Sequence, residues 1–201
     1  MPRNQKEMNE QIKEERRQLI LLTALKTFTR KGFAASKMTD ISTAANISYG
    51  LLYYYFKSKE EIYLELIKHA ASSSADLIKT IANDGNSRPI DKIHLLVTKI
   101  LEGIRNKDAA AYYFVLCIEA LTSDSNPKAV AQIVKEIMRP LTILADVILD
   151  GQKSKQIKQG DPMDMAIASF SMILGLSSLM ISGKIKHLPS SEIIYRIFEN
   201  S

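Results

Sequence analysis

The sequence predicts an all-α protein in which a small three-helix unit at the N-terminus is followed by a C-terminal helical bundle. Apolar residues recur at helical spacing along most of the chain, and no stretch alternates as a half-buried strand does. Glycine, proline and small polar residues interrupt this pattern where helices would end. The 201 residues suffice for one or two domains, and we place the boundary between residues 1–57 and 58–201.

Positive charge is concentrated at the N-terminus. Residues 1–59 hold 11 Lys/Arg against 5 Asp/Glu, a net charge of +6, whereas the remainder holds 16 against 17. Apolar content of 46% and charged content of 24% are ordinary for a globular protein. The asymmetry predicts a polyanionic partner for the N-terminal unit only.

The first predicted helix ends at about Lys31, after a polar stretch, residues 1–9, that we expect to be frayed. Its apolar face is formed by Ile20, Leu21, Ala24, Leu25 and Phe28. Gly32 follows as a natural C-terminal cap.

The stretch from Ser36 to Lys59 predicts two short helices joined by a tight turn. Ser36 is a plausible N-cap of the first helix, and Asn46 tolerates the left-handed conformation that a sharp turn requires. Ser48 can cap the second helix. This arrangement is a helix-turn-helix, whose second helix can lie in a DNA major groove.

The second helix presents an unusual outward face. At 100° per residue, Leu52 and Phe56 point to the core while Tyr53 and Tyr54 point away. Tyrosine hydroxyls can bond phosphate oxygens, and a small residue lets the backbone approach the groove. The residues expected at base edges are Tyr49, Gly50 and Leu51; those expected at phosphates are Ser36, Thr39, Ser48, Tyr53, Tyr54, Lys57 and Lys59. The alternative is that the tyrosines are core residues, which applies best to Tyr55.

The block ISYGLLYYYFKSKEEI resembles the DNA-reading segment of the TetR family of bacterial transcriptional regulators, whose pattern is close to DIA-x-x-AGVSKGTLYxYFxSKEEL. The run ILLTALKTFTRKGF resembles the first helix of that family, so the resemblance covers about residues 16–65. Tyr49 and Leu51 depart from the pattern where the family reads bases, so no operator sequence carries over. The resemblance implies a homodimer that binds a roughly palindromic operator and releases it when an effector enters the bundle.

The remaining helices follow from their end signals. Ser58 and Glu61 form a capping box that opens a long helix to about Ile81. Pro127 fits the first turn of a helix that runs to about Gly151, with a kink or break at Pro140. The other predicted helices span residues 89–105, 108–122, 161–182 and 189–200.

The sequence shows no catalytic or metal-binding motif, and its three histidines are isolated, so no enzyme activity, metal or cofactor is predicted. Cys117 is the only cysteine and fits a buried position. The N-terminus lacks an apolar signal-peptide core. The apolar run Met165–Ile181 contains four serines and is short for a membrane span. We therefore expect a cytoplasmic protein.

Two functional readings remain open. In the first, the chain is a repressor released by a small apolar or amphipathic effector, with candidate pocket residues Tyr112, Tyr113, Cys117 and Glu119. In the second, the same DNA-binding fold has no small-molecule effector and serves a protein-partner or architectural role. The helix Met163–Ile181 is apolar nearly all round, with small residues at Ala166, Ser169, Gly175 and Ser178, so we expect one of its faces to pack on a symmetric mate.

Overall fold

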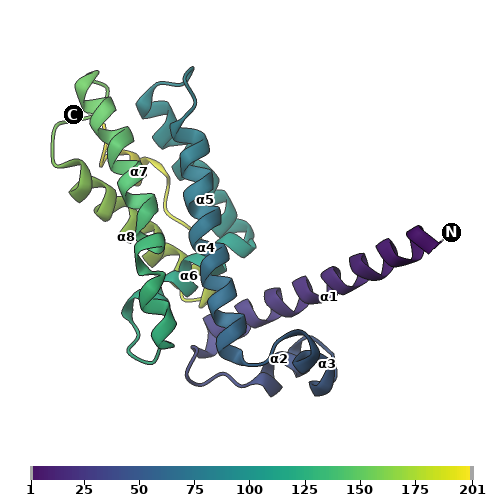
Figure 1. The fold of residues 1–201 in the computed structure, drawn as a ribbon. Coiled ribbons are helices and arrows are strands. Elements are labelled where there is room, and N and C mark those ends of the chain that lie inside the picture. The colour runs from purple at the N-terminus through teal and green to yellow at the C-terminus, as the bar shows by residue number, and fades with distance from the viewer. Residues whose placement is uncertain (1, 200–201) are drawn as a thin grey trace.

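The computed structural model describes residues 2–199 and contains nine α-helices and one 3₁₀ turn within that range (Figure 1). The helices are α1 Pro2–Lys31, α2 Met38–Ala44, α3 Tyr49–Tyr55, α4 Lys59–Ala82, α5 Pro89–Asn106, α6 Ala109–Thr122, α7 Val134–Lys153, α8 Pro162–Ile181 and α9 Glu192–Tyr195; the turn η1 is Lys128–Gln132. The described part of the chain is therefore all-α, as the sequence predicts.

The N-terminal head, which comprises α1–α3, lies at one end of the molecule, and α1 projects from it as a long arm (Figure 1). Helix α4 runs from the head into the bundle, where it packs on α7 and α6. Helix α8 packs in turn on α7 and α6. Since α1 also contacts α6, the head is attached to the bundle through two helices, α4 and α6.

Local capping chemistry explains most helix ends. Asn46 adopts a left-handed φ of 52°, and Ser48 caps α3 by accepting the Leu51 N–H. Ser58 accepts the Glu61 N–H at the start of α4. Asp161 caps α8 by accepting two N–H groups of its first turn. The end signals predicted at Asn46, Ser48 and Ser58 are confirmed.

Several predicted boundaries are wrong. Helix α1 begins at Pro2, so residues 2–9 are helical. Ser36 is not the cap of α2: that position is Lys37, whose backbone N–H donates to Asp40. The single helix expected from Pro127 is divided into η1 and α7, which meet at Ile133, because the chain turns there with 3₁₀ geometry.

Two further departures concern proline and the C-terminus. Pro140 lies inside α7 without ending it. The last helix is one turn long, Glu192–Tyr195, where the pattern had suggested residues 189–200.

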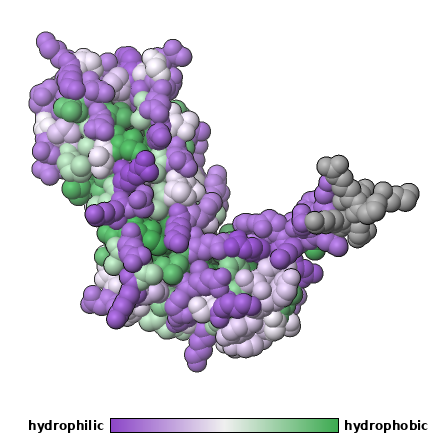
Figure 2. Space-filling model, in the orientation of Figure 1, coloured by the Kyte–Doolittle hydropathy of each residue, from purple (hydrophilic) through white to green (hydrophobic). Residues whose placement is uncertain are grey.

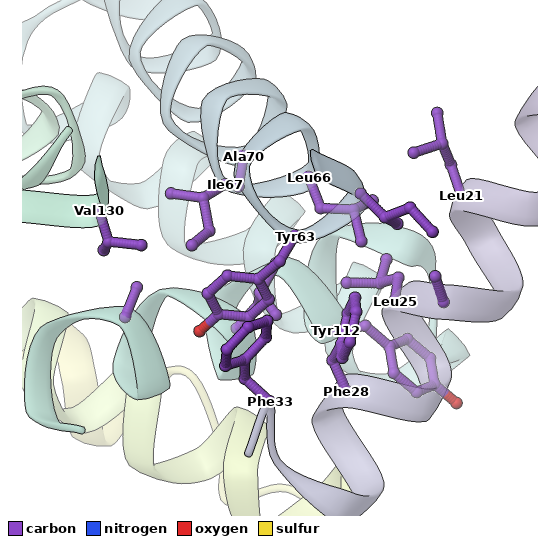
Figure 3. Close-up of a cluster of buried hydrophobic side chains, with 14 of the residues drawn as sticks. Leu21, Leu25, Phe28, Phe33, Tyr63, Leu66, Ile67, Ala70, Tyr112 and Val130 are labelled. Carbon is purple, nitrogen blue, oxygen red and sulfur yellow. The ribbon is translucent and has the colours of Figure 1, made fainter. Parts of the chain in front are cut away.

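The buried side chains form two hydrophobic cores. The head core joins α1–α3 to the first half of α4, to one face of α6, to η1 and to the start of α7, and it is centred on Phe28, Phe33 and Tyr63 (Figure 3). The bundle core joins the second half of α4 to α5, α7, α8 and α9 and includes Ala111 of α6. Helices α4 and α6 therefore contribute to both cores.

Among the described residues, α8 alone is long and apolar enough to cross a membrane by length and composition. A core helix of a soluble protein passes the same test. Helix α8 packs against three other long helices and buries Met165, Ile173 and Met180, while 33% of its apolar stretch is buried within the described chain.

Candidate nucleic-acid interface and ligand pocket

The outward face of α3 carries tyrosines that are held in a defined arrangement. Tyr49 is 49% exposed and Tyr54 is 61% exposed, whereas Leu52 is fully buried beneath them. The hydroxyls of Tyr49 and Tyr53 lie 3.1 Å apart and their ring centroids 4.7 Å apart. The hydrogen bond to Tyr49 raises the pKa of the Tyr53 phenol. The hydrogen bond and the ring contact hold the two hydroxyl groups side by side on the outward face of α3.

The other predicted contact residues fall into three groups. Thr39, Ser48, Gly50 and Lys57 are exposed, and Leu51 and Tyr53 are half-buried. Tyr55 is half-buried and packs against the head core, so the core interpretation holds for that tyrosine. Ser36 and Lys59 make internal contacts instead.

Ser36 is 1% exposed, and its hydroxyl donates to the Gly32 carbonyl at 2.7 Å. The Ser36 hydroxyl is therefore not exposed to a phosphate, and the predicted contact is wrong. The Lys59 ammonium donates to the carbonyls of Phe33, Ala34 and Ser36 at 2.9–3.2 Å and lies 4.4 Å from the Phe33 ring centroid. Lys59 thus holds the loop between α1 and α2, which is a structural role in place of the expected phosphate contact.

The structure also brings basic residues of α1 beside α3, which the sequence analysis missed. A shallow groove is lined by Lys13 and Arg16 on α1 and by Leu51 and Tyr54 on α3. The Lys13 ammonium lies 5.6 Å from the centroid of the Tyr54 ring. Lys13 and Arg16 lie within the predicted first helix, but the sequence alone does not show that this part of the helix packs beside α3.

A polar junction joins the second half of α6 to the head. Glu119 accepts the backbone N–H of Phe33 at 2.5 Å. Asn126 donates to the carbonyls of Glu119 and Ala120 and accepts from the Tyr63 hydroxyl at 3.0 Å. Partial burial raises the pKa of Glu119, and the Phe33 N–H offsets part of that rise. The loop before α2 is therefore bonded directly to the bundle.

An apolar cavity of about 210 Å³ lies in the bundle core. Its walls come from α4–α8 and from Phe198 near the end of the chain, and its lining is almost wholly apolar. Figure 2 shows apolar side chains gathered on this part of the bundle, whereas α1 is largely hydrophilic. Apolar cavities of this kind are typical of small-molecule sites.

Of the four predicted pocket residues, only Tyr113 lines this cavity. Tyr112 and Cys117 are buried in the head core, where burial raises the pKa of the Cys117 thiol to about 12. Glu119 belongs to the junction with the head. Tyr112, Cys117 and Glu119 therefore do not line the cavity, contrary to the prediction. Neighbouring residues of α6 point about 100° apart, so the helix directs some of them to the head and others to the cavity.

Within the described residues, no group of three His, Cys, Asp or Glu side chains is arranged to hold a metal ion. Cys117, the sole thiol, is buried and free.

Comparison with known proteins agrees with the geometry of the head. A family model described as bacterial regulatory proteins of the tetR family matches residues 20–66, which span the second part of α1 through the start of α4. The chain is 26% identical over 181 residues to an HTH-type transcriptional regulator of Bacillus subtilis, YhgD, whose function is uncharacterised; the match covers 87% of each chain.

Solved structures extend the similarity to the bundle. A Clostridium perfringens protein described as a fatty acid metabolism regulator superposes with a TM-score of 0.70 at 23% identity, over 89% of this chain and 94% of that one. AibR, solved with isovaleryl coenzyme A and operator DNA, superposes with a TM-score of 0.67 at 16% identity, over 90% and 94%. The matched head sequence, the exposed face of α3 and the shared all-helical architecture lead to one assignment. The chain belongs to the TetR family, whose members are DNA-binding transcriptional regulators and not enzymes.

Proposed function

We propose that the chain is a homodimeric repressor that leaves a roughly palindromic operator when a small apolar or amphipathic molecule occupies the bundle cavity. One observation carries this proposal. Helix α4 lines the cavity with Leu77 and Ile78, and the same helix packs Ile62 and Tyr63 into the head core. A ligand that prefers one packing of α4 can therefore change the position of the head.

The DNA contacts form the first part of the proposal. Tyr49, Gly50 and Leu51 meet base edges, and Leu51 suits a thymine methyl group. Phosphates are bound by Thr39, Ser48, Tyr53, Tyr54 and Lys57. The groove beside α3 adds Lys13 to these phosphate contacts, because its ammonium lies next to Tyr54.

The symmetric mate forms the second part. Ile167 and Leu179 of α8 are 44% and 45% exposed, and Leu149 of α7 is 40% exposed. Gly175 lies on the exposed side of α8, and a Cβ placed there would meet no atom within 4 Å. Glycine inside a helix costs about 1 kcal/mol relative to alanine. A second copy of the chain that packs closely against α8 at Gly175 would explain why a glycine stands there despite its cost.

Of the other small residues considered for this interface, Ala166 and Ser169 are buried inside the protomer and Ser178 is half-buried. The proposed interface is accordingly the exposed side of α8 together with α7. Light scattering should give the mass of a dimer at micromolar concentration, and Gly175→Glu should shift it to a monomer. A monomeric mass for the unaltered protein would remove the symmetric arrangement from the proposal.

The names of similar proteins agree with the effector part. AibR was solved with an acyl coenzyme A and operator DNA together, and another structure of this fold is a SmeT–triclosan complex. A relative in Pseudomonas putida, NicS, is named a transcriptional repressor. For this chain we propose that residues 1–57 bind DNA and that residues 58–201 hold the ligand and the dimer interface. We place the protein in the cytoplasm.

The test has two stages. Selection of duplexes from a random library by the purified protein should yield a site with two inverted half-sites. Compounds that raise the Tm of the protein are then added to the complex, and operator affinity should fall by the coupling free energy, typically about 1–3 kcal/mol. Compounds that bind in the cavity yet leave operator affinity unchanged would favour the effector-free regulator.

A further inference from the structure

We infer that the bundle cavity takes a ligand with an apolar chain and an anionic head group, and that Lys99 is the counter-charge for that head. The inference rests on the proposed function only in treating the cavity as the effector site. It adds the chemical class of the ligand and a residue that determines specificity.

The deep end of the cavity suits a hydrocarbon chain. Ile93, Ile173 and Phe198 line it and are between 0% and 5% exposed. Ser169 is also there, but its hydroxyl already donates to the Ala166 carbonyl at 3.0 Å. A polar head group placed at this end would lose its hydration and find no free donor, so only the chain fits there.

The opening of the cavity lies between α4, α5 and α6. The exposed members of its lining are Ser73 and Leu77 on α4, Lys99 on α5 and Ala110 on α6. A ligand that enters with its hydrocarbon chain first therefore leaves its head group at the opening, beside Lys99.

Lys99 is available to pair with that head group. In the described part of the chain its ammonium makes no hydrogen bond or ion pair, and no Asp or Glu is among the residues that line the cavity. Glu102 and Asp108 are the nearby carboxylates in sequence, and neither is bonded to Lys99. An unpaired cation at the rim of an apolar pocket selects an anion over a neutral or cationic head.

Ser73 and Tyr113 line the cavity, and His69 lies beside both of them. The His69 ring lies 5.2 Å from that of Tyr113, and His69 Nε2 is 3.4 Å from the Ser73 hydroxyl. These side chains offer donors at the opening. A free fatty carboxylate and a fatty acyl group carried on a phosphate-bearing coenzyme share the required chemistry, and the experiment separates them.

The chain contains no tryptophan, which permits a direct reporter. Leu77 lies on the cavity wall and is 39% exposed, so Leu77→Trp places a single indole at the opening. Its fluorescence is followed during titration with dodecanoate, dodecanol, dodecyltrimethylammonium, dodecanoyl coenzyme A and coenzyme A alone, below the concentrations at which each forms micelles.

Dodecanoate should bind more tightly than dodecanol, and the cationic probe should bind least. Lys99→Gln in the reporter protein should weaken dodecanoate by about fivefold, the size expected for an exposed ion pair, and leave dodecanol unchanged. Arg105→Gln removes a charge from the exposed side of α5 outside the cavity and should change neither. If dodecanoyl coenzyme A binds more tightly than dodecanoate while coenzyme A alone does not bind, the head group is the phosphate-bearing one.

Equal affinity for dodecanoate and dodecanol, an unchanged preference in Lys99→Gln, or no fluorescence change with any probe would overturn the inference. Operator binding is measured on the same samples. Dodecanoate bound in the cavity without any loss of operator affinity would defeat the proposed switch and leave the ligand class standing, so the two failures are distinguishable.

Discussion

The head core and the bundle core bury similar kinds of residues but differ in how they are held. In the head core, the rings of Phe28, Phe33 and Tyr63 pack together, with the Phe28 and Tyr63 centroids 5.2 Å apart (Figure 3). The side chains of Lys59 and Glu119 bond the adjoining loop backbone. The bundle core is mostly aliphatic and surrounds a cavity of about 210 Å³. We expect from this difference that the head moves as a unit, whereas the bundle can adjust its packing around the proposed ligand.

The strongest test of this comparison is to remove one ring from each region. Phe28→Ala should lower the free energy of unfolding by about 3–5 kcal/mol, because the fully buried ring leaves a void that its neighbours cannot fill. Phe170 lines the cavity and is half-buried, so Phe170→Ala should cost about 1–2 kcal/mol. Urea unfolding measures both. Equal losses would mean that the two cores are equally tightly packed.

A second test separates structural from DNA-binding lysines within the head. Lys59→Met should lower the free energy of unfolding by about 1–3 kcal/mol, because three loop carbonyls lose their partner. It should leave the salt dependence of operator binding nearly unchanged.

Lys57→Met is the matched control for that experiment. Lys57 is exposed and its ammonium bonds only the Tyr53 carbonyl, so loss of the side chain should leave stability within about 0.5 kcal/mol. The slope of log affinity against log salt should fall by about one. The reverse pattern in the two variants would restore Lys59 as a phosphate contact.

A third test asks whether sequence preference is confined to the exposed face of α3. Leu51→Ala should reduce discrimination at one base pair by about 1 kcal/mol. Tyr53→Phe removes a proposed phosphate contact and should weaken binding to all sequences alike. Selection from a random duplex library with each variant provides the measurement, and an unchanged preference in Leu51→Ala would exclude that residue from base reading.

The smallest effect concerns the junction between the two regions. Burial raises the pKa of Glu119, so the folded chain binds this proton more tightly than the unfolded chain. The Glu119 contribution to stability is full below the ordinary pKa of 4.5 and is lost as pH rises through the folded pKa.

Glu119→Gln keeps an acceptor for the Phe33 N–H and removes the titration. Relative to the wild-type protein, the variant should therefore gain stability as pH rises above 4.5, by no more than about 1 kcal/mol, because the carboxyl is only half-buried. Chemical unfolding at several pH values provides the measurement. A difference between the two proteins that does not vary with pH would show that Glu119 titrates in the folded protein as it does in the unfolded chain.

Sequence reasoning succeeded where the determining chemistry is local. Asn46, Ser48, Ser58 and Asp161 act within a few residues of their own position, so their roles could be inferred from spacing alone. The all-α class follows for the same reason, because helical periodicity is a property of short segments.

The errors arise from contacts between distant segments. The Lys59 ammonium reaches back to the loop at residues 33–36, and nothing in the spacing distinguishes that partner from a phosphate. On α6, Tyr112 and Tyr113 are neighbours of identical type, yet one enters the head core and the other lines the cavity. Their assignment depends on the rotation of α6 between α1 and α8, which tertiary packing sets.

Helix α4 is unbroken from Lys59 to Ala82. At 1.5 Å per residue, its 24 residues make a rod about 36 Å long. A tilt of about 5° at the cavity end displaces the other end of such a rod by about 3 Å, close to the 3.4 Å rise of one base pair. In the proposed dimer, a mate moving in the opposite sense would change the spacing between recognition helices by nearly two base-pair steps. A small change in the packing of α4 at the proposed ligand site would then put both helices out of register with their grooves.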